Sequence, residues 1–381
     1  MRKLSIFLAI ALLLFHIQLC PAQATRLSQT RTSDKYADKL RAFEDFVRQQ
    51  MEKNKVPGLT VGFIKDDYIW VKGFGYTDLE NKTPATTDSA YRFASVQKSM
   101  TATAILQLAE QAKINLDAEV QTYVPYFPRK NYPITVRQLL YHLGGIPHYV
   151  NRDLEQHIKE HKTTREAIAI FENFDLIAEP GTKFSYSSYG YNLLGAVIEG
   201  ASKQSYADYL REHIWRPLGM NDTRMDDPLD FIPNRVRGYQ IINGELKNSE
   251  FIDVSSRFAA GGTRGTVRDL LNFMRGLNDG RVLSPKSLDL MYAPMRTRDG
   301  NISGFPKTAG YAMGWNLVPQ RDGLVVINDG GQQETRTFIL NFPSKKFALA
   351  VAQNLESDDD GAIIFRLYEL VLNEKFSLGG Q

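Results

Sequence analysis

The order of strand-like and helix-like segments constrains the fold of this chain more than any other feature. Near the N-terminus, residues 59–64 and 68–74 are rich in β-branched and aromatic side chains and are separated by a Lys-Asp-Asp turn. Four similar runs lie near the C-terminus, at residues 314–318, 324–328, 335–341 and 347–353. The long stretch between the two groups has helical periodicity instead. We therefore predict an α+β fold of three layers, in which the N- and C-terminal segments build one antiparallel sheet and the middle is an all-helical insertion.

Helices are predicted around and between the strand segments. Residues 33–54 carry apolar side chains at helical spacing up to a Val-Pro-Gly stop, and residues 362–374 form a last helix. Residues 148–178 are charge-rich and expected to be helical, whereas residues 222–248 have the composition of a loop. Shorter helical runs lie at residues 101–112, 191–200, 206–215, 266–277 and 285–291. Because the strands of both ends share one sheet, we predict a single domain over residues 33–376.

The N-terminus has the three parts of a secretory signal. A basic Met-Arg-Lys start precedes an apolar run at residues 4–19, and an Ala-Gln-Ala sequence ending at Ala24 supplies the small side chains of a cleavage site. We predict that residues 1–24 are a signal peptide cleaved after Ala24 and that residues 25–32 are a flexible segment. The mature protein is then expected to be periplasmic or secreted.

Two other interpretations of the N-terminus stay open. An uncleaved membrane anchor would use the same apolar run, although this run is short for a membrane span and contains His16 and Gln18. A lipoprotein signal would use Cys20, although Leu19 before it is larger than such a signal prefers. Contact with a membrane is therefore expected only if the signal is not removed.

The cysteine content and the net charge of the chain limit which functions are expected of it. Cys20 is the only cysteine, so a chain cleaved after Ala24 would contain no disulfide. Cleavage would also remove two basic residues and no acidic ones, which lowers the formal net charge from +3 to +1. A nearly neutral chain has no charge that calls for a nucleic acid, so the predicted partner is a small-molecule ester, amide or peptide substrate. The oligomeric state is not defined by these features.

A candidate nucleophile lies just before the helical run that starts at Thr101. In the Ser95-x-x-Lys98 sequence, a hydroxyl and an amine are three residues apart, so on a helix both side chains lie on one face. The amine could take the proton of the hydroxyl, and apolar surroundings would lower the pKa of Lys98 toward that role. Free backbone N–H groups at the first turn would stabilise an oxyanion. The same two residue types also occur at this spacing by chance, and Ser95 alone could simply cap a helix.

Two further segments carry candidate site residues. Residues 180–195 form a loop that leads into a helix and contain Tyr186, a phenol that would ionise more readily beside an ammonium group and then act as a base. This tyrosine could equally be a packing aromatic. The Asn-Asp-Gly-Gly sequence that starts at Asn328 ends an apolar strand, where Gly330 and Gly331 would allow close approach of another backbone and offer an N–H to an oxyanion. The alternative is an ordinary turn.

Together these three segments resemble the serine β-lactamase and penicillin-binding protein superfamily, and in particular its branch of class C β-lactamases, D-alanyl-D-alanine carboxypeptidases and esterases. The likeness covers roughly residues 42–355, and the motifs come in the family's order. Further matching segments are residues 92–98, 139–146, 217–223, 260–263 and 311–315. The resemblance implies a β-lactamase/transpeptidase-like fold.

Residue by residue, the resemblance implies roles in catalysis. Ser95 would be the acyl-accepting nucleophile and Lys98 its proton partner. Tyr186 would be the general base and acid of the family's Tyr-x-Asn motif. Backbone N–H groups of Ser95 and Gly331 would form the oxyanion hole. His142 is implied to be structural, since the family places a histidine at this bend away from the nucleophile.

The chain departs from the family at two motifs. Ser188 stands where the family has the Asn that positions the lysine and the substrate. Asn328 stands where the third motif has a cationic or imidazole side chain, and Asp329 at its middle position would repel a substrate carboxylate. A family glycine further on is replaced by Glu334, which adds a second acid unless Arg336 pairs with it.

We therefore predict an exported serine hydrolase that forms an acyl-enzyme at Ser95, cleaves an ester or amide without a free carboxylate beside the scissile bond, and is a weak β-lactamase. Two alternatives stay open: a D-alanyl-D-alanine carboxypeptidase-like cell-wall peptidase, and a catalytically impaired binding or scaffold protein on the same fold. His157 and His161 have a spacing that could bind a metal on a helix face, but charged residues surround them. We therefore predict neither a metal nor a cofactor.

Overall fold

The computed structural model describes residues 35–149, 158–357 and 361–378. The predicted signal peptide, its cleavage after Ala24 and the segment 25–32 lie outside these residues. Within the described ranges, no helix combines the length and the apolar character that crossing a membrane requires.

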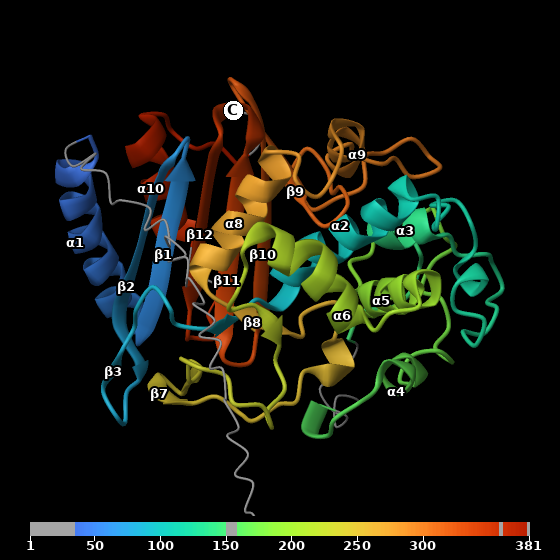
Figure 1. The fold of residues 1–381 in the computed structure, drawn as a ribbon, viewed down its shortest axis with the longest axis horizontal. Coiled ribbons are helices and arrows are strands. Elements are labelled where there is room, and N and C mark those ends of the chain that lie inside the picture. Colours follow the sequence, from blue (N-terminus) through green and yellow to red (C-terminus); the bar gives the residue numbers. More distant parts are fainter. Residues whose placement is uncertain (1–34, 150–157, 358–360, 379–381) are drawn as a thin grey trace, which may run out of the picture.

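Seven strands form one antiparallel sheet, which lies on the left in Figure 1, with the helical middle of the chain on the right. They are β1 (Gly58–Lys65), β2 (Tyr68–Asp78), β3 (Thr83–Pro84), β9 (Asn316–Gln320), β10 (Gly323–Gln332), β11 (Thr335–Phe342) and β12 (Phe347–Gln353). Their order across the sheet is β3-β2-β1-β12-β11-β10-β9. Strand β1 pairs with β12, with Leu59 opposite Gln353 and Lys65 opposite Phe347. The two ends of the chain therefore meet inside one sheet, as predicted.

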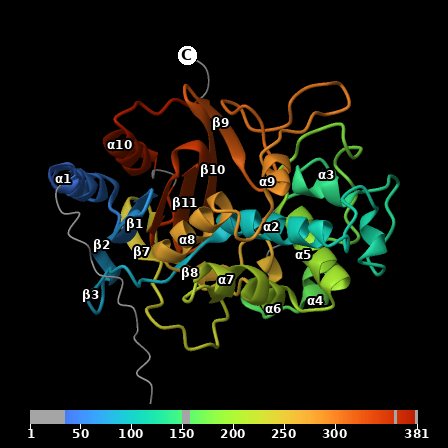
Figure 2. The same cartoon turned by 45° about the horizontal axis from the view of Figure 1, so that its top comes forward.

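Helices cover both faces of this sheet. On one face lie α1 (Ala37–Asn54) and α10 (Gly361–Leu372), whose buried side chains, such as Phe43 and Ile364, pack onto the strands. On the other face, α8 (Val267–Asn278) and the helical middle of the chain share a second apolar core with the sheet (Figure 2). This arrangement confirms the predicted three-layer α+β fold class.

Helix α1 follows directly from the sequence pattern. Its buried side chains, Leu40, Phe43, Val47 and Met51, recur every three or four residues and so form one stripe that faces the sheet. The helix ends at Lys55, which takes the left-handed conformation with φ +56°.

The middle of the chain supplies most of the second helical layer. Its helices are α2 (Gln97–Glu110), α3 (Val136–Leu140), α4 (Thr164–Ala169), α5 (Ser188–Ser202), α6 (Tyr206–Leu210), α7 (Arg216–Leu218) and α9 (Pro285–Met291). A π-helical turn, Arg211–Trp215, joins α6 to α7. Helix α2 is central, because every residue from Gln97 to Leu108 is buried. The first turn of α2 is therefore held on all sides.

The helical segment predicted at residues 148–178 is largely wrong where the structure describes it, at residues 148–149 and 158–178, and its residues 150–157 lie outside the described ranges. Helix α4 is the only α-helix among the described residues of this segment. After it, the Lys130 ammonium group takes the backbone carbonyls of Glu172 and Phe174, at 2.5 and 2.8 Å. These contacts fix the turns that follow α4.

The insertion also contains strands, and the prediction of a loop at residues 222–248 missed three of them. Strand β5 (Arg224–Met225) joins β8 (Thr263–Gly265) and β4 (Tyr91–Arg92) in a small sheet with β8 in the middle. Strands β6 (Tyr239–Ile242) and β7 (Glu245–Asn248) form a hairpin. Its turn is an Asn-Gly pair with both φ angles positive, at +51° and +81°. An Asn-Gly pair between short strands is a strong hairpin signal, so the sequence did contain the evidence.

Candidate active site

The segment around Ser95 leads from the small sheet into helix α2. Strand β4 ends at Arg92, a 3-10 turn covers Ala94–Val96, and α2 starts at Gln97. Ala94 has φ +47°, in the left-handed region that residues with a Cβ atom rarely adopt. Strained backbone of this kind persists only where the surroundings impose it, and it often lies beside reacting groups.

Lys98 lies beside Ser95, as the three-residue spacing predicts. Its Nζ atom is 2.9 Å from Ser95 Oγ and donates to the Ala260 carbonyl at 3.0 Å. Burial lowers the pKa of Lys98 well below 10.5, and nearby Arg257 adds to this effect while the Asp329 carboxylate opposes it. A lowered pKa increases the share of neutral amine, and a neutral amine at this distance can accept the serine proton.

Tyr186 also reaches the nucleophile. Its hydroxyl is hydrogen-bonded to Ser95, and its ring centre lies 4.9 Å from Lys98 Nζ. Burial of the hydroxyl raises the pKa of Tyr186 above 10, against the prediction that the neighbouring lysine would make this phenol ionise more readily. The prediction failed because it counted the charge of the lysine and not the loss of solvent around the phenol. Burial thus favours the protonated phenol of Tyr186, and its role as general base stays a prediction.

Two neutral histidines support the loop that carries Tyr186. The backbone N–H of Ser187 donates to His142 Nδ1 at 3.0 Å, and that of Ser188 donates to His148 Nδ1 at 3.1 Å. Burial lowers the pKa of His142 well below 6.5 and that of His148 to about 4, so both rings accept at Nδ1 at neutral pH. His142 thus has the structural role implied by the resemblance. Sequence reasoning did not single out His148, although it lies directly after the glycine-rich bend.

Ser188 is the first residue of α5 and is buried. Within the described part of the chain, the hydrogen-bond partners of Lys98 Nζ are Ser95 and Ala260, so Ser188 does not take over the lysine contact of the Asn that it replaces. Its predicted contact with substrate stays a prediction.

Strand β10 runs directly against the Ser95 segment. A Cβ atom at Gly330 would lie 2.6 Å from Ser95 N, so only glycine allows this approach, and Gly331 follows along the strand. Asn328 is buried, and its Nδ2 donates to Ser95 O, Ser99 Oγ and Gly314 O at 3.2, 2.9 and 3.0 Å. Its amide therefore braces the Ser95 segment, and the substrate contact predicted for Asn328 stays a prediction.

Asp329 and Glu334, the two acids near the third motif, each pair with arginine. The sequence analysis considered only Arg336 as a partner of Glu334. Arg336 pairs with Asp329 at 2.7 Å. Glu334 pairs with Arg264 at 2.7 Å and with Arg92 at 3.3 Å. Both acids are therefore countered by arginines, and the negative charge of Asp329 is balanced at the edge of the site.

A segment around Ala260 completes the site, and sequence reasoning assigned it no role. The Ala260 carbonyl accepts from Lys98, and Thr263 N donates to the side-chain oxygen of Gln97 at 3.0 Å. The Ala-Gly-Gly-Thr sequence at this position was noticed as a match to the family, and that match was the available signal. In the described residues, no group of three or more His, Cys, Asp and Glu side chains could hold a metal ion.

Known proteins have sequences similar to that of this chain. The family model described as Beta-lactamase matches residues 43–373. The human protein named serine beta-lactamase-like protein LACTB, mitochondrial, is 28% identical over 374 residues, which covers 75% of this chain and 67% of that protein. The chain thus spans about two thirds of the length of this relative.

Solved structures with related sequences share the fold. The octameric penicillin-binding protein homologue from Pyrococcus abyssi is 28% identical with a TM-score of 0.75, covering 88% of this chain and 78% of that chain. The D-amino acid amidase from Ochrobactrum anthropi SV3 is 25% identical with a TM-score of 0.76, covering 88% of this chain and 99% of that chain. With the family model matched over most of the chain, this protein belongs to the β-lactamase family, within the superfamily of serine β-lactamases and penicillin-binding proteins.

Proposed function

We propose that this chain is an exported serine hydrolase that cleaves an ester or an amide through an acyl-enzyme at Ser95. The observation that carries the proposal is the 2.9 Å contact between Lys98 Nζ and Ser95 Oγ, made by a lysine whose pKa burial has lowered. Export is supported by the basic, apolar and small-residue order of residues 1–24.

The proposed reaction has two steps. Lys98 takes the Ser95 proton while Oγ bonds to the substrate carbonyl carbon, and the carbonyl oxygen becomes an oxyanion beside the N–H groups of Ser95 and Gly331. The oxyanion then collapses, the bond to the leaving group breaks, and the leaving group takes a proton through the Tyr186 hydroxyl, which Lys98 replenishes. In the second step a water molecule gives a proton to the Lys98 amine while its oxygen bonds to the acyl carbon, which forms a second oxyanion. This intermediate collapses, the bond between Ser95 Oγ and the acyl carbon breaks, and Oγ takes the proton back from Lys98, so the acid is released and the free enzyme is restored.

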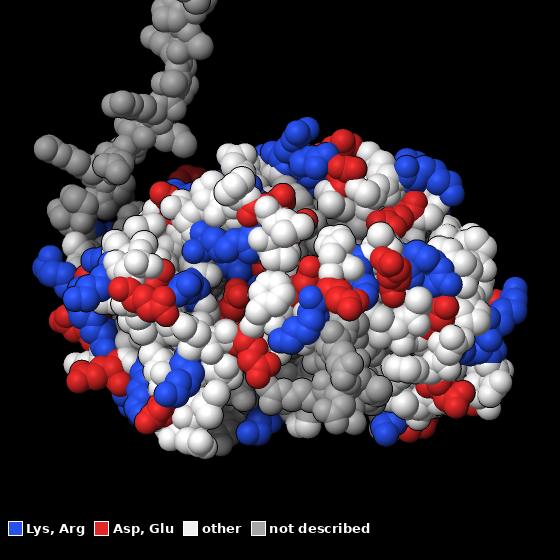
Figure 3. Space-filling view, turned by 90° about the horizontal axis from the view of Figure 1, so that it is seen from below, with Lys and Arg blue, Asp and Glu red and all other residues white. Residues whose placement is uncertain are grey.

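The substrate is proposed to be a neutral ester or amide without a carboxylate beside the scissile bond. Asp329 lies on the strand next to Gly330, and its charge is already balanced by Arg336, so the pair offers no net positive charge to a carboxylate. The likeness to a D-amino acid amidase supports an amide as the substrate class. On the face seen in Figure 3, acidic and basic side chains are interspersed, which supports a small-molecule partner over a polyanion.

A cell-wall peptidase of the D-alanyl-D-alanine carboxypeptidase type is the second candidate. The likeness to a penicillin-binding protein homologue favours it, whereas the Asp329–Arg336 pair disfavours a substrate with a terminal carboxylate. The two candidate functions therefore differ in the charge of the substrate group that would lie along β10: neutral for the ester or amide, and negative for the cell-wall peptide.

The test combines labelling with turnover. Intact-protein mass is measured after a fluorophosphonate and, separately, after a penicillin, with Ser95→Ala as control. We expect a mass increase that requires Ser95, and faster hydrolysis of a neutral nitrophenyl ester than of a cephalosporin. Folded protein that neither reagent labels would point to a binding or scaffold protein instead, and faster cephalosporin turnover would overturn the substrate class.

A further inference from the structure

The turn between β10 and β11 contacts several segments around the nucleophile. Gln332 Nε2 donates to the Gly261 carbonyl at 2.9 Å. Gln333 accepts from Arg92 at its backbone carbonyl and from Arg257 at its side-chain oxygen, at 3.4 and 3.3 Å. The turn thus joins the strand before the nucleophile to the segment whose carbonyl accepts from the catalytic lysine.

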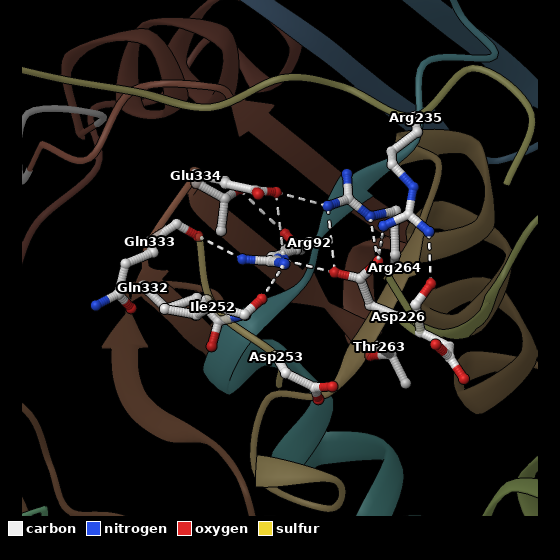
Figure 4. A network of polar contacts seen from close by, with 12 residues as sticks. Arg92, Asp226, Arg235, Ile252, Asp253, Thr263, Arg264, Gln332, Gln333 and Glu334 are labelled. Carbon is white, nitrogen blue, oxygen red and sulfur yellow. Dashed lines mark hydrogen bonds and ion pairs between the residues drawn. The ribbon is translucent and has the colours of Figure 1, made fainter. Parts of the chain in front are cut away.

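Glu334, the last residue of the turn, belongs to an ion cluster formed by Arg92, Asp226, Arg235, Arg264 and Glu334 (Figure 4). Its Oε2 atom lies 2.7 Å from Arg264 Nη2 and 3.3 Å from Arg92 Nε. Both arginines also bind the buried Asp226 carboxylate, at 2.9 and 2.5 Å, and Arg235 binds it at 2.8 Å. Three guanidinium groups therefore share two carboxylates.

The charge of Glu334 is needed because two of these arginines are buried. Arg92 is 3% exposed and Arg264 is 1% exposed. Without the Glu334 carboxylate, three guanidinium groups would share the single carboxylate of Asp226, and the uncompensated positive charge that is left in a buried place is strongly unfavourable. We expect such a cluster to open and admit water.

The backbone of Glu334 is also held against its own preference. Its φ angle is +76°, in the left-handed region that favours glycine. Gly238 packs so closely that a Cβ atom there would lie 2.1 Å from the Glu334 Cα atom. The ion pairs of the Glu334 side chain and the close packing of Gly238 thus hold the Glu334 backbone in a conformation that glycine would adopt more easily.

The cluster connects to the reacting serine at two points. Arg92 is three residues before Ser95, and Gly330, four residues before Glu334, packs against Ser95 N. We infer that Glu334 is a positioning residue for acylation: its carboxylate holds the β10–β11 turn on Arg92, so that β10 stays against the Ser95 segment where the oxyanion would form. This inference rests on the proposed acyl-enzyme function, and Glu334 itself touches no substrate.

The test uses Glu334→Gln, which keeps the shape and removes the charge, and Glu334→Gly, which also frees the backbone. Glu374→Gln is the matched control, because it removes another paired carboxylate, that of the Lys345 pair, outside the site. Three quantities are measured in the full chain: kcat and KM for a neutral nitrophenyl ester, the thermal unfolding midpoint, and hydrogen–deuterium exchange of peptides that cover residues 93–98 and 328–332.

For both Glu334 variants we expect kcat to fall about tenfold or more with KM within about twofold, and faster exchange in both peptides, while Glu374→Gln behaves as wild type. An unchanged exchange rate, or faster exchange with an unchanged kcat, would overturn the positioning role. A variant with a lower unfolding midpoint and a normal kcat would show that the cluster is only structural. If wild-type protein hydrolyses no ester and neither a fluorophosphonate nor a penicillin labels Ser95, the proposed function fails, and the exchange data still decide whether Glu334 holds β10 against the Ser95 segment.

Discussion

Gly330 and Ser95 touch through their backbones, since a Cβ atom at position 330 would stand 2.6 Å from Ser95 N. We expect Gly330→Ala to lower kcat for a nitrophenyl ester by about 100-fold, because backbone must move to admit the methyl group. Gly331→Ala is the matched comparison: its Cβ would meet the end of the Arg336 side chain at 2.7 Å, and that flexible side chain can shift. Steady-state kinetics of the two variants measure the difference, and equal losses would contradict this account.

Lys98 should determine how the rate depends on pH. Its pKa is lowered by burial, and a base acts only when deprotonated, so kcat/KM should rise with pH through a midpoint well below 10.5. Lys98→Met should lower kcat by about 10²- to 10⁴-fold and remove this limb of the profile. Rates between pH 5 and 10 provide the measurement. A variant that keeps the wild-type profile would rule out Lys98 as the base.

Asp269, at the start of α8, should make stability depend on pH. Its carboxylate accepts from Asp222 N and Thr223 Oγ1 at 3.0 and 2.7 Å, yet burial raises the pKa of Asp269 to about 7. Between about pH 4 and pH 7 the native state holds a proton that the unfolded state releases, so the free energy of unfolding should fall as pH rises through this range and then level off. Asp269→Asn should flatten this part of the curve. Urea unfolding at pH 5 and pH 8 checks it, and parallel changes in both proteins would exclude Asp269 as the cause.

Asp226 should contribute strongly to stability. Burial alone would raise the pKa of Asp226, but the guanidinium groups of Arg264 and Arg92 outweigh it and hold this pKa below its usual range. The contribution is therefore present at neutral pH and is lost as pH falls below about 4. Asp226→Asn should lower the free energy of unfolding at pH 7 by about 3 to 5 kcal/mol, because buried guanidinium groups lose their shared partner. Asp38→Asn, which breaks an exposed pair, should leave unfolding nearly unchanged in the same denaturant titration.

Local patterns in the sequence were sufficient to predict six of the seven strands of the large sheet, all but β3, and the central pair of the site. The strands carry runs of β-branched and aromatic residues, so their positions near both ends of the chain could be predicted. Ser95 and Lys98 are three residues apart on one helical turn, so their contact depends on local geometry alone. The Asn-Gly turn of the β6–β7 hairpin was equally local, and the sequence analysis missed it.

Contacts between distant residues could not be predicted in this way. The pairing of Glu334 with Arg264, and of Arg336 with Asp329, depends on where side chains from separate strands point after folding. The pKa of Tyr186 depends on solvent removed by groups from several segments, which a motif does not record. The family motifs therefore indicated where the candidate site lies, but only the structure shows which charged side chains around it are paired.

The pairing of β1 with β12 has a consequence for folding. Leu59 and Gln353 are roughly 290 residues apart in the chain, and their strands are neighbours inside the sheet. Closing so long a loop carries a large entropic cost before any contact repays it, so the chain has a high contact order and should fold slowly. Until its last strand has been synthesised, a nascent chain leaves β1 without one of its two neighbours, and a C-terminal truncation that removes β12 divides the sheet between β1 and β11.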